Sequence, residues 1–241
     1  MQHLSEQQID LLESLASKVQ EWNEKVNLIS RKDVEFIVPN HIMPSLAISL
    51  VKRFDEHDTV IDVGTGGGFP GLPMAIACPN TAFTLLDSNA KKMKIVEEIA
   101  TSLGLKNVEV VTSRAEAFTD RKYKFIMGRA VSNLPNFLSF SSHFLDADAG
   151  GSPMNGDMSS KTGGLLYLKG GDFGDELDMA GIEQHSLHPV KDLVQGLDTD
   201  KNVLYIPAAD VLRFHADMLR RNEALAIERE MRKKMAKEKK R

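Results

Sequence analysis

The 241-residue sequence predicts an α/β fold with a doubly wound, mostly parallel sheet. A β-branched run at residues 60–63 leads directly into a turn, residues 64–71, that is rich in glycine. Short apolar strands and helical segments then alternate as far as residue 168. Asp62 and Asp87 lie at or near the ends of the first two predicted strands. Because open parallel sheets bind ligands at the carboxyl ends of their strands, the turn and these acids predict a binding site.

Residues 1–54 are expected to form an N-terminal helical cap on this sheet. Ser5 and Gln8 fit the capping box of a first helix that extends to about residue 24. Asp33 is placed to cap a second helix, which prolines should divide because they lack the backbone donor. These prolines are Pro39 and Pro44.

Residues 55–207 are expected to contain the sheet. Apolar and β-branched runs predict strands at residues 60–63, 82–87, 108–112, 125–128 and 165–168. The helices between them are predicted at residues 71–77, 90–103 and 134–144. A final strand pair is expected at residues 185–194 and 202–206, joined through Gly196. The alternation of strands and helices implies parallel strands with helical crossovers.

Two segments stand outside this pattern. Residues 146–163 are rich in Gly, Ser, Asp and Asn and could not fill a core, so we expect a flexible insert. Residues 208–241 are expected to form a basic C-terminal helix and tail. Residues 228–241 hold eight Lys/Arg and three Glu, a net charge of +5 against −9 for the rest of the chain. Such a run is either an additional RNA-binding segment or a solvated end of the chain.

Composition narrows the class of protein. A formal net charge of −4 and a pI near 6.0 do not by themselves indicate a nucleic-acid-binding protein. The single cysteine, Cys78, excludes an internal disulfide and a multi-cysteine zinc site. No apolar run reaches membrane-spanning length, and the N-terminus lacks the core of a signal peptide. We expect a soluble cytoplasmic protein, with an organellar protein whose targeting segment was removed as the second choice.

The glycine turn discriminates between two cofactor classes. Dinucleotide-binding turns follow G-x-G-x-x-G, and Phe69 occupies the position of the third glycine. Asp62 stands two residues before Gly64, where its charge would repel a pyrophosphate but suits the sulfonium and ammonium of S-adenosylmethionine. Glycines at alternate positions would let the backbone pass close to that cofactor. They are Gly64, Gly66 and Gly68.

Residues after the second and third strands also point to a nucleoside. Asp87 is placed to accept hydrogen bonds from both ribose hydroxyls. Ala115 and Glu116 follow the third strand, where the adenine edge is expected. Two acids also have structural interpretations, because Asp62 could cap the turn and Asp87 could cap the helix that begins near Ser88.

Residues 62–73, Asp-Val-Gly-Thr-Gly-Gly-Gly-Phe-Pro-Gly-Leu-Pro, resemble the signature of the ribosomal small-subunit methyltransferase G family, also called glucose-inhibited division protein B. Other methyltransferases share its glycines but not its Phe-Pro-Gly-x-Pro extension. The resemblance covers about residues 5–207, because further blocks agree in order and spacing. They are Trp22-Asn23-x-x-x-Asn27-Leu28, His41 with Ser45-Leu46, Leu86-Asp87-Ser88 with Lys91-Lys92, and Ser113-Arg114-Ala115-Glu116 followed by Arg129-Ala130 and Leu168-Lys169-Gly170. Pro44 departs from the Asp that many members carry, which weakens a catalytic role for the His41 block.

The resemblance implies a class I, Rossmann-like methyltransferase that transfers the methyl group of S-adenosylmethionine to N7 of one guanosine in small-subunit ribosomal RNA. The partner it implies is that RNA or a ribosomal particle. We expect a monomer that uses no metal ion and no membrane. The cofactor contacts that the resemblance implies are Gly64, Phe69, Ala115, Glu116 and Arg129. Asp87 and the other turn glycines join them from the arguments above.

The expected chemistry is simple. Guanine N7 already carries a free lone pair, so alignment of the reacting atoms and control of charge replace a general base. The sequence shows no compelling base–nucleophile pair, and we assign no catalytic residue. Arg129 could bind the cofactor or substrate, or could pair with Glu116. Basic residues near the same rim are candidates for RNA phosphates, although the first two could form a solvated helix face: Lys91, Lys92, Arg114 and Lys169.

Three other functions stay open at this point. The same cofactor could serve a small-molecule acceptor, although the closeness of the family blocks argues against this. The chain could also be a non-catalytic RNA-binding module that uses its basic tail. A dinucleotide-dependent oxidoreductase is the weakest alternative, because Phe69 and Asp62 both oppose it.

Overall fold

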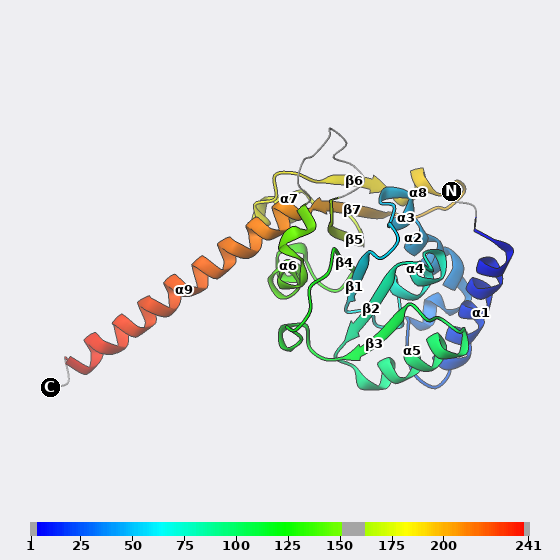
Figure 1. The fold of residues 1–241 in the computed structure, drawn as a ribbon, viewed down its shortest axis with the longest axis horizontal. Helices are drawn as coiled ribbons and strands as arrows, with labels where there is room; N and C mark the ends of the chain where they lie inside the picture. Colours follow the sequence, from blue (N-terminus) through cyan, green and yellow to red (C-terminus); the bar gives the residue numbers. More distant parts are fainter. Residues whose placement is uncertain (1–3, 151–161, 239–241) are drawn as a thin grey trace.

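The computed structural model describes residues 4–150 and 162–238. Seven strands form one sheet in the order β3-β2-β1-β4-β5-β7-β6 within these ranges (Figure 1). The strands are β1 (Thr59–Val63), β2 (Ala82–Asp87), β3 (Val108–Thr112), β4 (Phe125–Arg129), β5 (Gly164–Gly170), β6 (Ser186–Pro189) and β7 (Lys201–Pro207). Strands β1 to β5 pair in parallel, whereas β7 pairs antiparallel with β5 and β6. The predicted doubly wound, mostly parallel sheet is confirmed.

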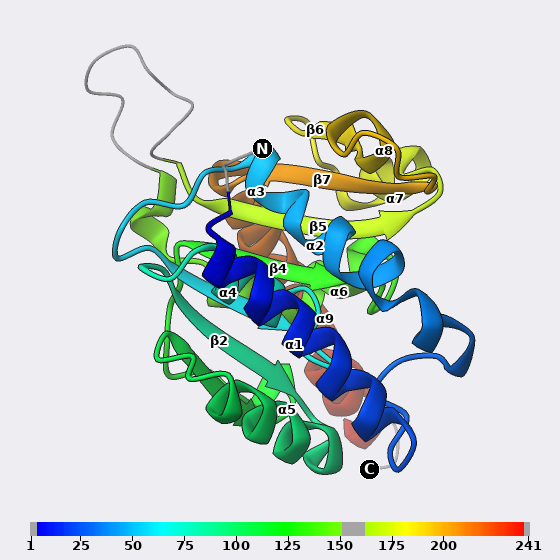
Figure 2. The same ribbon diagram turned by 90° about the vertical axis from the view of Figure 1, so that its right-hand side faces the viewer.

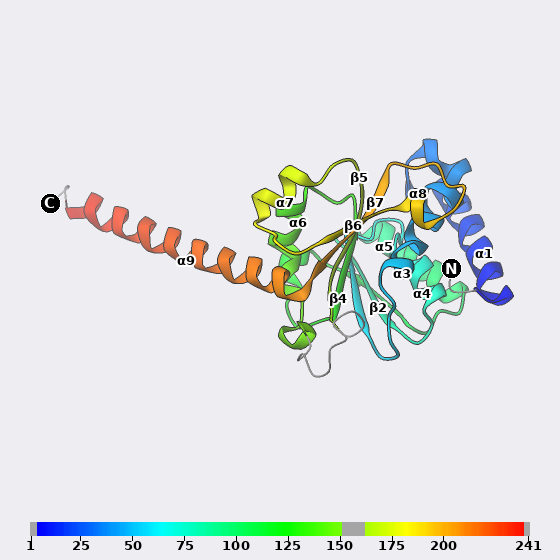
Figure 3. The same cartoon turned by 90° about the horizontal axis from the view of Figure 1, so that it is seen from above.

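Helices cover both faces of the sheet, and Figure 3 shows the strands between the two groups. The first group comprises α1 (Glu6–Asn23), α2 (Met43–Leu46), α3 (Ile48–Val51), α4 (Gly71–Ala77) and α5 (Ala90–Ser102). The second comprises α6 (Leu134–Ser141), α7 (Gly174–Ala180) and the first turns of α9 (Ala208–Glu238). Each group buries its own set of apolar side chains against the sheet.

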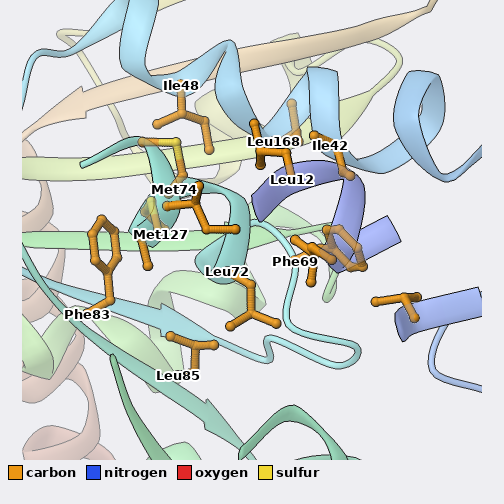
Figure 4. Packing of buried hydrophobic residues seen from close by; sticks show 14 of the residues in the cluster. Leu12, Ile42, Ile48, Phe69, Leu72, Met74, Phe83, Leu85, Met127 and Leu168 are labelled. Atoms are coloured by element: carbon orange, nitrogen blue, oxygen red, sulfur yellow. The ribbon is translucent and has the colours of Figure 1, made fainter. Parts of the chain in front are cut away.

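Apolar packing fixes the N-terminal helices to the first face of the sheet (Figure 4). Leu12 of α1 and Ile48 of α3 are buried in one cluster with Leu72 and Met74 of α4. Phe69 of the glycine turn belongs to the same cluster and is 1% exposed. Burial of each such side chain is worth about 1.5–3 kcal/mol, so this face holds the cap and the turn together.

The first helix begins as the sequence predicts. Ser5 accepts from the backbone of Gln8 and the Gln8 side chain accepts from the backbone of Ser5, which completes the capping box. Figure 2 shows α1 lying across the sheet face beside α4. The amide nitrogen of Gln8 donates to the backbone oxygens of Ile76, at 2.9 Å, and Ala77, at 3.1 Å, which tie α1 to the end of α4.

The second predicted helix is divided as its prolines require. It consists of a 3-10 turn (Arg31–Phe36), a π-helical turn (Val38–Ile42), α2 and α3. The expectation that Asp33 caps it is wrong, because Ser30 accepts from the backbone of Lys32 at the start of the 3-10 turn. Asp33 instead accepts from the side chain of Asn40 at 2.8 Å.

The C-terminal half differs from the prediction in two places, the first of which is α7, a helix that the sequence analysis did not predict. The strand expected at residues 185–194 ends at Pro189, and α8 (Val190–Leu193) follows it. A proline ends an edge strand readily because it has no N–H to donate, and Val190 is then fully buried. Residues 151–161 of the predicted insert lie outside the described residues, and residues 147–150 form a 3-10 turn.

The order of the strands positions a crevice. Strands β2 and β3 lie on one side of β1, and β4 and β5 lie on the other. The chain therefore changes direction between β1 and β4, and the crevice opens at the carboxyl ends of these strands. The glycine turn leaves the sheet at this point, directly after Val63.

Candidate active site

The glycine turn is wound around the carboxylate of Asp62. One oxygen, Oδ2, accepts from the Thr65 hydroxyl at 2.6 Å and from the Gly71 backbone N–H at 2.8 Å. Gly64, Gly66 and Gly68 adopt φ angles of +75°, +58° and +88°, which side-chain-bearing residues rarely adopt. The interpretation of Asp62 as a cap for the turn is therefore correct. The cap uses only one of the two carboxylate oxygens.

The other oxygen of Asp62 points to a ligand. Asp62 is fully buried, and Oδ1 has no hydrogen-bond partner among the described residues. Burial raises the pKa of Asp62 to about 6, although the hydrogen bonds from Thr65 and Gly71 and the charge of Arg129 oppose the rise. A buried acceptor without a donor is costly, so this oxygen fits the cationic end of a bound molecule.

A cavity of about 260 Å³ opens beside the turn, at the carboxyl ends of β1, β2 and β3. It brings together four of the predicted cofactor residues: Gly64, Asp87, Ala115 and Glu116. The remaining lining residues are Val63, Leu86, Ser88, Ser113, Arg114, Val131 and Phe140. The four other predicted residues lie outside this lining: Gly66, Gly68, Phe69 and Arg129.

The turn and the strand ends support each other around the cavity. Asp87 Oδ2 accepts from the Gly66 backbone N–H at 2.9 Å, and Oδ1 accepts from the Asn89 N–H at 2.9 Å. Asn89, rather than Asp87, caps α5 through the backbone of Lys92. A Cβ atom at Gly64 would lie 2.8 Å from a methyl carbon of Val131, so the wall of the cavity requires glycine there.

Arg129 forms the centre of a second cluster, next to the turn. Its guanidinium lies 5.3 Å from the centre of the Phe69 ring and donates to Nδ1 of His41. Burial lowers the pKa of Arg129 to about 10, and the charges of Asp62 and Asp33 act in the opposite direction. The charges that face Arg129 are therefore Asp62 and Asp33, whereas Glu116 is exposed in the cavity wall.

His41 is neutral in this cluster. Its ring packs 5.2 Å from the Phe69 ring, and Nε2 lies 3.5 Å from Asp33 Oδ2. Burial, followed by the charge of Arg129, lowers the pKa of His41 to about 4, while Asp33 opposes the shift. His41 therefore supports Arg129 as a hydrogen-bond acceptor, a role that the sequence could not assign.

The segment after β4 forms one wall of the cavity and is held from β5. Ala130 adopts a φ of +48°, an uncommon conformation for a residue with a side chain. The buried hydroxyl of Tyr167 accepts from the N–H groups of Val131 and Ser132, at 3.1 and 3.2 Å, and donates to the Ser132 oxygen at 2.6 Å. Sequence reasoning missed Tyr167, because only the pairing of β5 with β4 brings it to this segment.

The four predicted RNA-binding residues have different surroundings. Lys169 forms an ion pair with Glu176, whose carboxylate also accepts from the Leu134 N–H at 2.7 Å. Lys92 donates to the backbone oxygen of Leu28 at 3.4 Å. Lys91 and Arg114 are exposed, and neither forms an ion pair with a described residue.

Neither a membrane-spanning helix nor a metal-binding cluster is present among the described residues. No helix among them is long and apolar enough to cross a membrane. No group of three or more His, Cys, Asp or Glu side chains in residues 4–150 and 162–238 could hold a metal ion.

The family model of rRNA small subunit methyltransferase G, GidB, matches residues 8–187. The chain belongs to this family. A ribosomal RNA small subunit methyltransferase G of Cytophaga hutchinsonii is 36% identical over 207 residues, which are 86% of this chain and 95% of the relative. That of Flavobacterium johnsoniae is 42% identical over 175 residues, 73% of this chain and 79% of the relative. The resemblance that residues 62–73 indicate is confirmed.

Solved structures share the fold of this family member. MtNAS in complex with MTA and tNA matches with a TM-score of 0.53 at 13% identity, over 81% of this chain and 70% of that one. A variant of MtNAS in complex with S-adenosylmethionine gives a TM-score of 0.51 at 14% identity, over 81% and 72% of the two chains. At these identities the likeness concerns the fold alone.

The neutral state of His41 predicts a pH dependence of stability. Because the native pKa is about 4 and the ordinary value is 6.5, the unfolded chain binds the extra proton between these values. The stabilisation is full above pH 6.5 and is lost as the pH falls towards 4, at up to about 1.4 kcal/mol per pH unit. We expect His41→Asn, whose amide oxygen can still accept from Arg129, to lose less stability than the wild type between pH 7 and 5. Urea unfolding of both proteins checks this, and parallel pH profiles would contradict it.

Proposed function

We propose that this chain transfers the methyl group of S-adenosylmethionine to N7 of one guanosine in small-subunit ribosomal RNA. The observation that carries the proposal is the family match over residues 8–187, a range that contains every lining residue of the cavity. The unpartnered oxygen of Asp62 favours a cationic cofactor over a pyrophosphate. We place the reaction in the bacterial cytoplasm and expect a monomer.

The residues around the cavity fit this cofactor. Asp87 is placed for the ribose hydroxyls, and Ala115 and Glu116 for the adenine edge. Asp62 lies outside the cavity lining, directly before Val63, and its Oδ1 is the acceptor that we assign to the ammonium group. Gly64 keeps the wall clear, because a side chain there would collide with Val131. When bound, S-adenosylmethionine supplies an electrophilic methyl group on a positively charged sulfur.

The chain itself has to bind the cofactor and the RNA, align the reacting atoms and control the charge around them. Guanine N7 offers a lone pair without deprotonation, so no side chain needs to act as a general base. Arg129 stays cationic at neutral pH, since its pKa is about 10, and it lies at the carboxyl end of β4 where substrates enter such sheets. It is placed to bind the O6 edge of guanine or an adjacent phosphate.

A cleavage assay tests the proposed function. Small-subunit RNA from a strain that lacks the gene is incubated with the purified protein and S-adenosylmethionine, then treated with borohydride and aniline. This treatment cleaves the RNA at N7-methylguanosine, and we expect one new stop in primer extension. RNA without a new stop contradicts the proposal, and methyl transfer to free metabolites alone would support a small-molecule acceptor instead.

Asp87 gives the first residue-level prediction. We expect Asp87→Ala to weaken S-adenosylmethionine binding by about 1.5–3 kcal/mol, the worth of a charged hydrogen bond. Asp87→Asn keeps an oxygen for the Gly66 N–H and is the matched control, so it should lose less. Calorimetric titration measures both variants, and a dissociation constant for Asp87→Ala equal to that of the wild type would remove the assignment.

A further inference from the structure

The outer part of α9 takes no part in the site described above. Every side chain from residue 219 to residue 232 is exposed, as is Met235. Residues 219–238, which we name the arm, span about 30 Å at 1.5 Å per residue. Figures 1 and 3 show the arm leaving the body beside α6 and α7, on the side away from α1.

Burial against the body does not hold the arm in its helix. Its sequence is rich in Ala, Leu, Glu, Arg, Lys and Met, the residues with the strongest intrinsic helix propensity. Arg232 donates to Glu228 at 2.6 Å, and Arg220 pairs with Asp217. Most helices in proteins are stabilised by packing, so the exposed arm depends on its composition and on these side-chain pairs for its helical structure.

The charge of the arm is opposite to that of the body. Residues 219–238 hold seven Lys/Arg and four Glu, a net charge of +3, whereas the rest of the chain carries −7. Electrostatic screening acts over about 8 Å at physiological ionic strength, which is much shorter than the arm. A polyanion can therefore meet the outer cations without the repulsion of the acidic body. RNA, with one negative charge per phosphate, is a partner of this chemistry.

A second copy of the chain fits the arm less well. Its large exposed apolar residues are spaced by six, two, four and four positions, which does not place them on one face. A coiled coil needs alternating spacings of three and four, and two arms of like charge would repel each other. These apolar residues are Leu219, Leu225, Ile227, Met231 and Met235.

We propose that the arm is a second RNA-binding surface, which holds the phosphate backbone outside the active site without reading its sequence. The family model ends at residue 187, before α9 begins, so the proposal concerns a feature outside the matched part of the family. That the RNA is ribosomal rests on the proposed function, whereas the attraction for phosphate does not. In this proposal the arm contributes affinity for the RNA, and the cavity is where methyl transfer takes place.

The test uses the full chain with four cations of the arm neutralised: Arg229→Gln, Arg232→Gln, Lys233→Gln and Lys234→Gln. Glutamine preserves helix propensity. The matched control removes four exposed cations of the body instead: Arg53→Gln, Lys94→Gln, Lys106→Gln and Lys191→Gln. Both variants have the same net charge, so a difference between them reports position rather than total charge.

Filter binding to small-subunit RNA is measured between 50 and 200 mM KCl. We expect the arm variant to bind at least about tenfold more weakly, with the slope of log K against log salt reduced by about 3, while the control stays near the wild type. Circular dichroism checks helix content. Equal losses in both variants, or no loss in either, would overturn the proposal. A wild-type dimer that the arm variant abolishes in sedimentation equilibrium would assign the arm to a second copy and overturn it too.

Methyl transfer separates this proposal from the proposed function. If both are correct, the arm variant raises KM for the RNA and leaves kcat and S-adenosylmethionine binding unchanged. If RNA binding depends on the arm but neither the wild type nor either variant methylates a guanosine, the proposal for the arm is retained and the proposed function is contradicted. If the arm variant methylates the RNA with an unchanged KM, the proposal for the arm is contradicted and the proposed function is retained.

Discussion

An Asp62→Asn variant is expected to be more stable than the wild type at pH 8 and to bind S-adenosylmethionine more weakly. The native carboxylate has a pKa of about 6 against an ordinary value of 3.8, so its ionisation costs the folded state up to about 3 kcal/mol. Asparagine removes this cost, and its amide oxygen can still accept from Thr65 and Gly71. We expect a gain of about 1–3 kcal/mol in the free energy of unfolding.

The sign of the effect fixes its pH window. A carboxyl group whose native pKa is raised stabilises the fold below its unfolded pKa, and this contribution is lost as the pH rises through the native value. The advantage of Asp62→Asn should therefore appear between pH 4 and 6 and remain constant above. His41 titrates in an overlapping range in the opposite direction, but it is present in both proteins and leaves their difference largely unaffected.

Urea unfolding at pH 4.5 and pH 8 and calorimetric titration of the cofactor measure the two halves of this prediction. Loss of the charge that faces the ammonium group should weaken binding by about 10- to 100-fold. Thr65→Val is the control, because it removes a hydrogen bond from Oδ2 and keeps the carboxylate. It should lower stability, whereas Asp62→Asn raises it. Equal stability of Asp62→Asn and wild type at pH 8 would show that the ionised form carries no cost in the fold.

The strands could be predicted well because the same apolar and β-branched residues both favour a strand locally and pack into the core. Strands β1 to β5 fall within one or two residues of their predicted limits. The apolar runs of β1, β2, β4 and β5 are buried in the sheet, and those of the edge strand β3 are half-buried. The end of the chain was harder to predict. Pairing of β6 with β7 ends at Pro189, and residues 190–193, Val-Lys-Asp-Leu, form α8 instead of extending the strand. Proline has no N–H to donate to a further strand pair, which is consistent with the end of β6 at this residue.

The candidate site was predictable only where consecutive residues build it. The glycine turn, Asp87 and residues 115–116 follow strands directly, so their meeting at one edge of the sheet could be inferred. His41 and Tyr167 could not be found in this way. His41 reaches Arg129 across 88 positions and Tyr167 reaches Ser132 across 35, and only the packed fold brings each pair together. Phe69, which the family resemblance implies as a cofactor contact, is a buried support for Arg129 outside the lining of the cavity.

An Arg129→Ala variant is expected to lose methyl transfer by about 100-fold or more, the cost of removing one preorganised charge from an active site. Two contacts are lost at once: the guanidinium over the Phe69 ring and the hydrogen bond to His41. Their removal should lower the free energy of unfolding by about 1–3 kcal/mol. Arg129→Lys is the matched control, because it keeps the charge but not the planar group that stacks on Phe69. It should retain part of the activity.

The pKa of His41 separates this role from general damage to the fold. Burial, followed by the charge of Arg129, holds that pKa down, so removal of the charge should raise the pKa of His41 from about 4 part of the way towards 6.5, with Asp33 then favouring the protonated ring. The lysine variant should shift it less, because a cation remains nearby. NMR titration of the imidazole signals measures the pKa in all three proteins. An unchanged pKa in a folded Arg129→Ala protein would contradict the electrostatic coupling, and near-normal methyl transfer would contradict a role for Arg129 in the reaction.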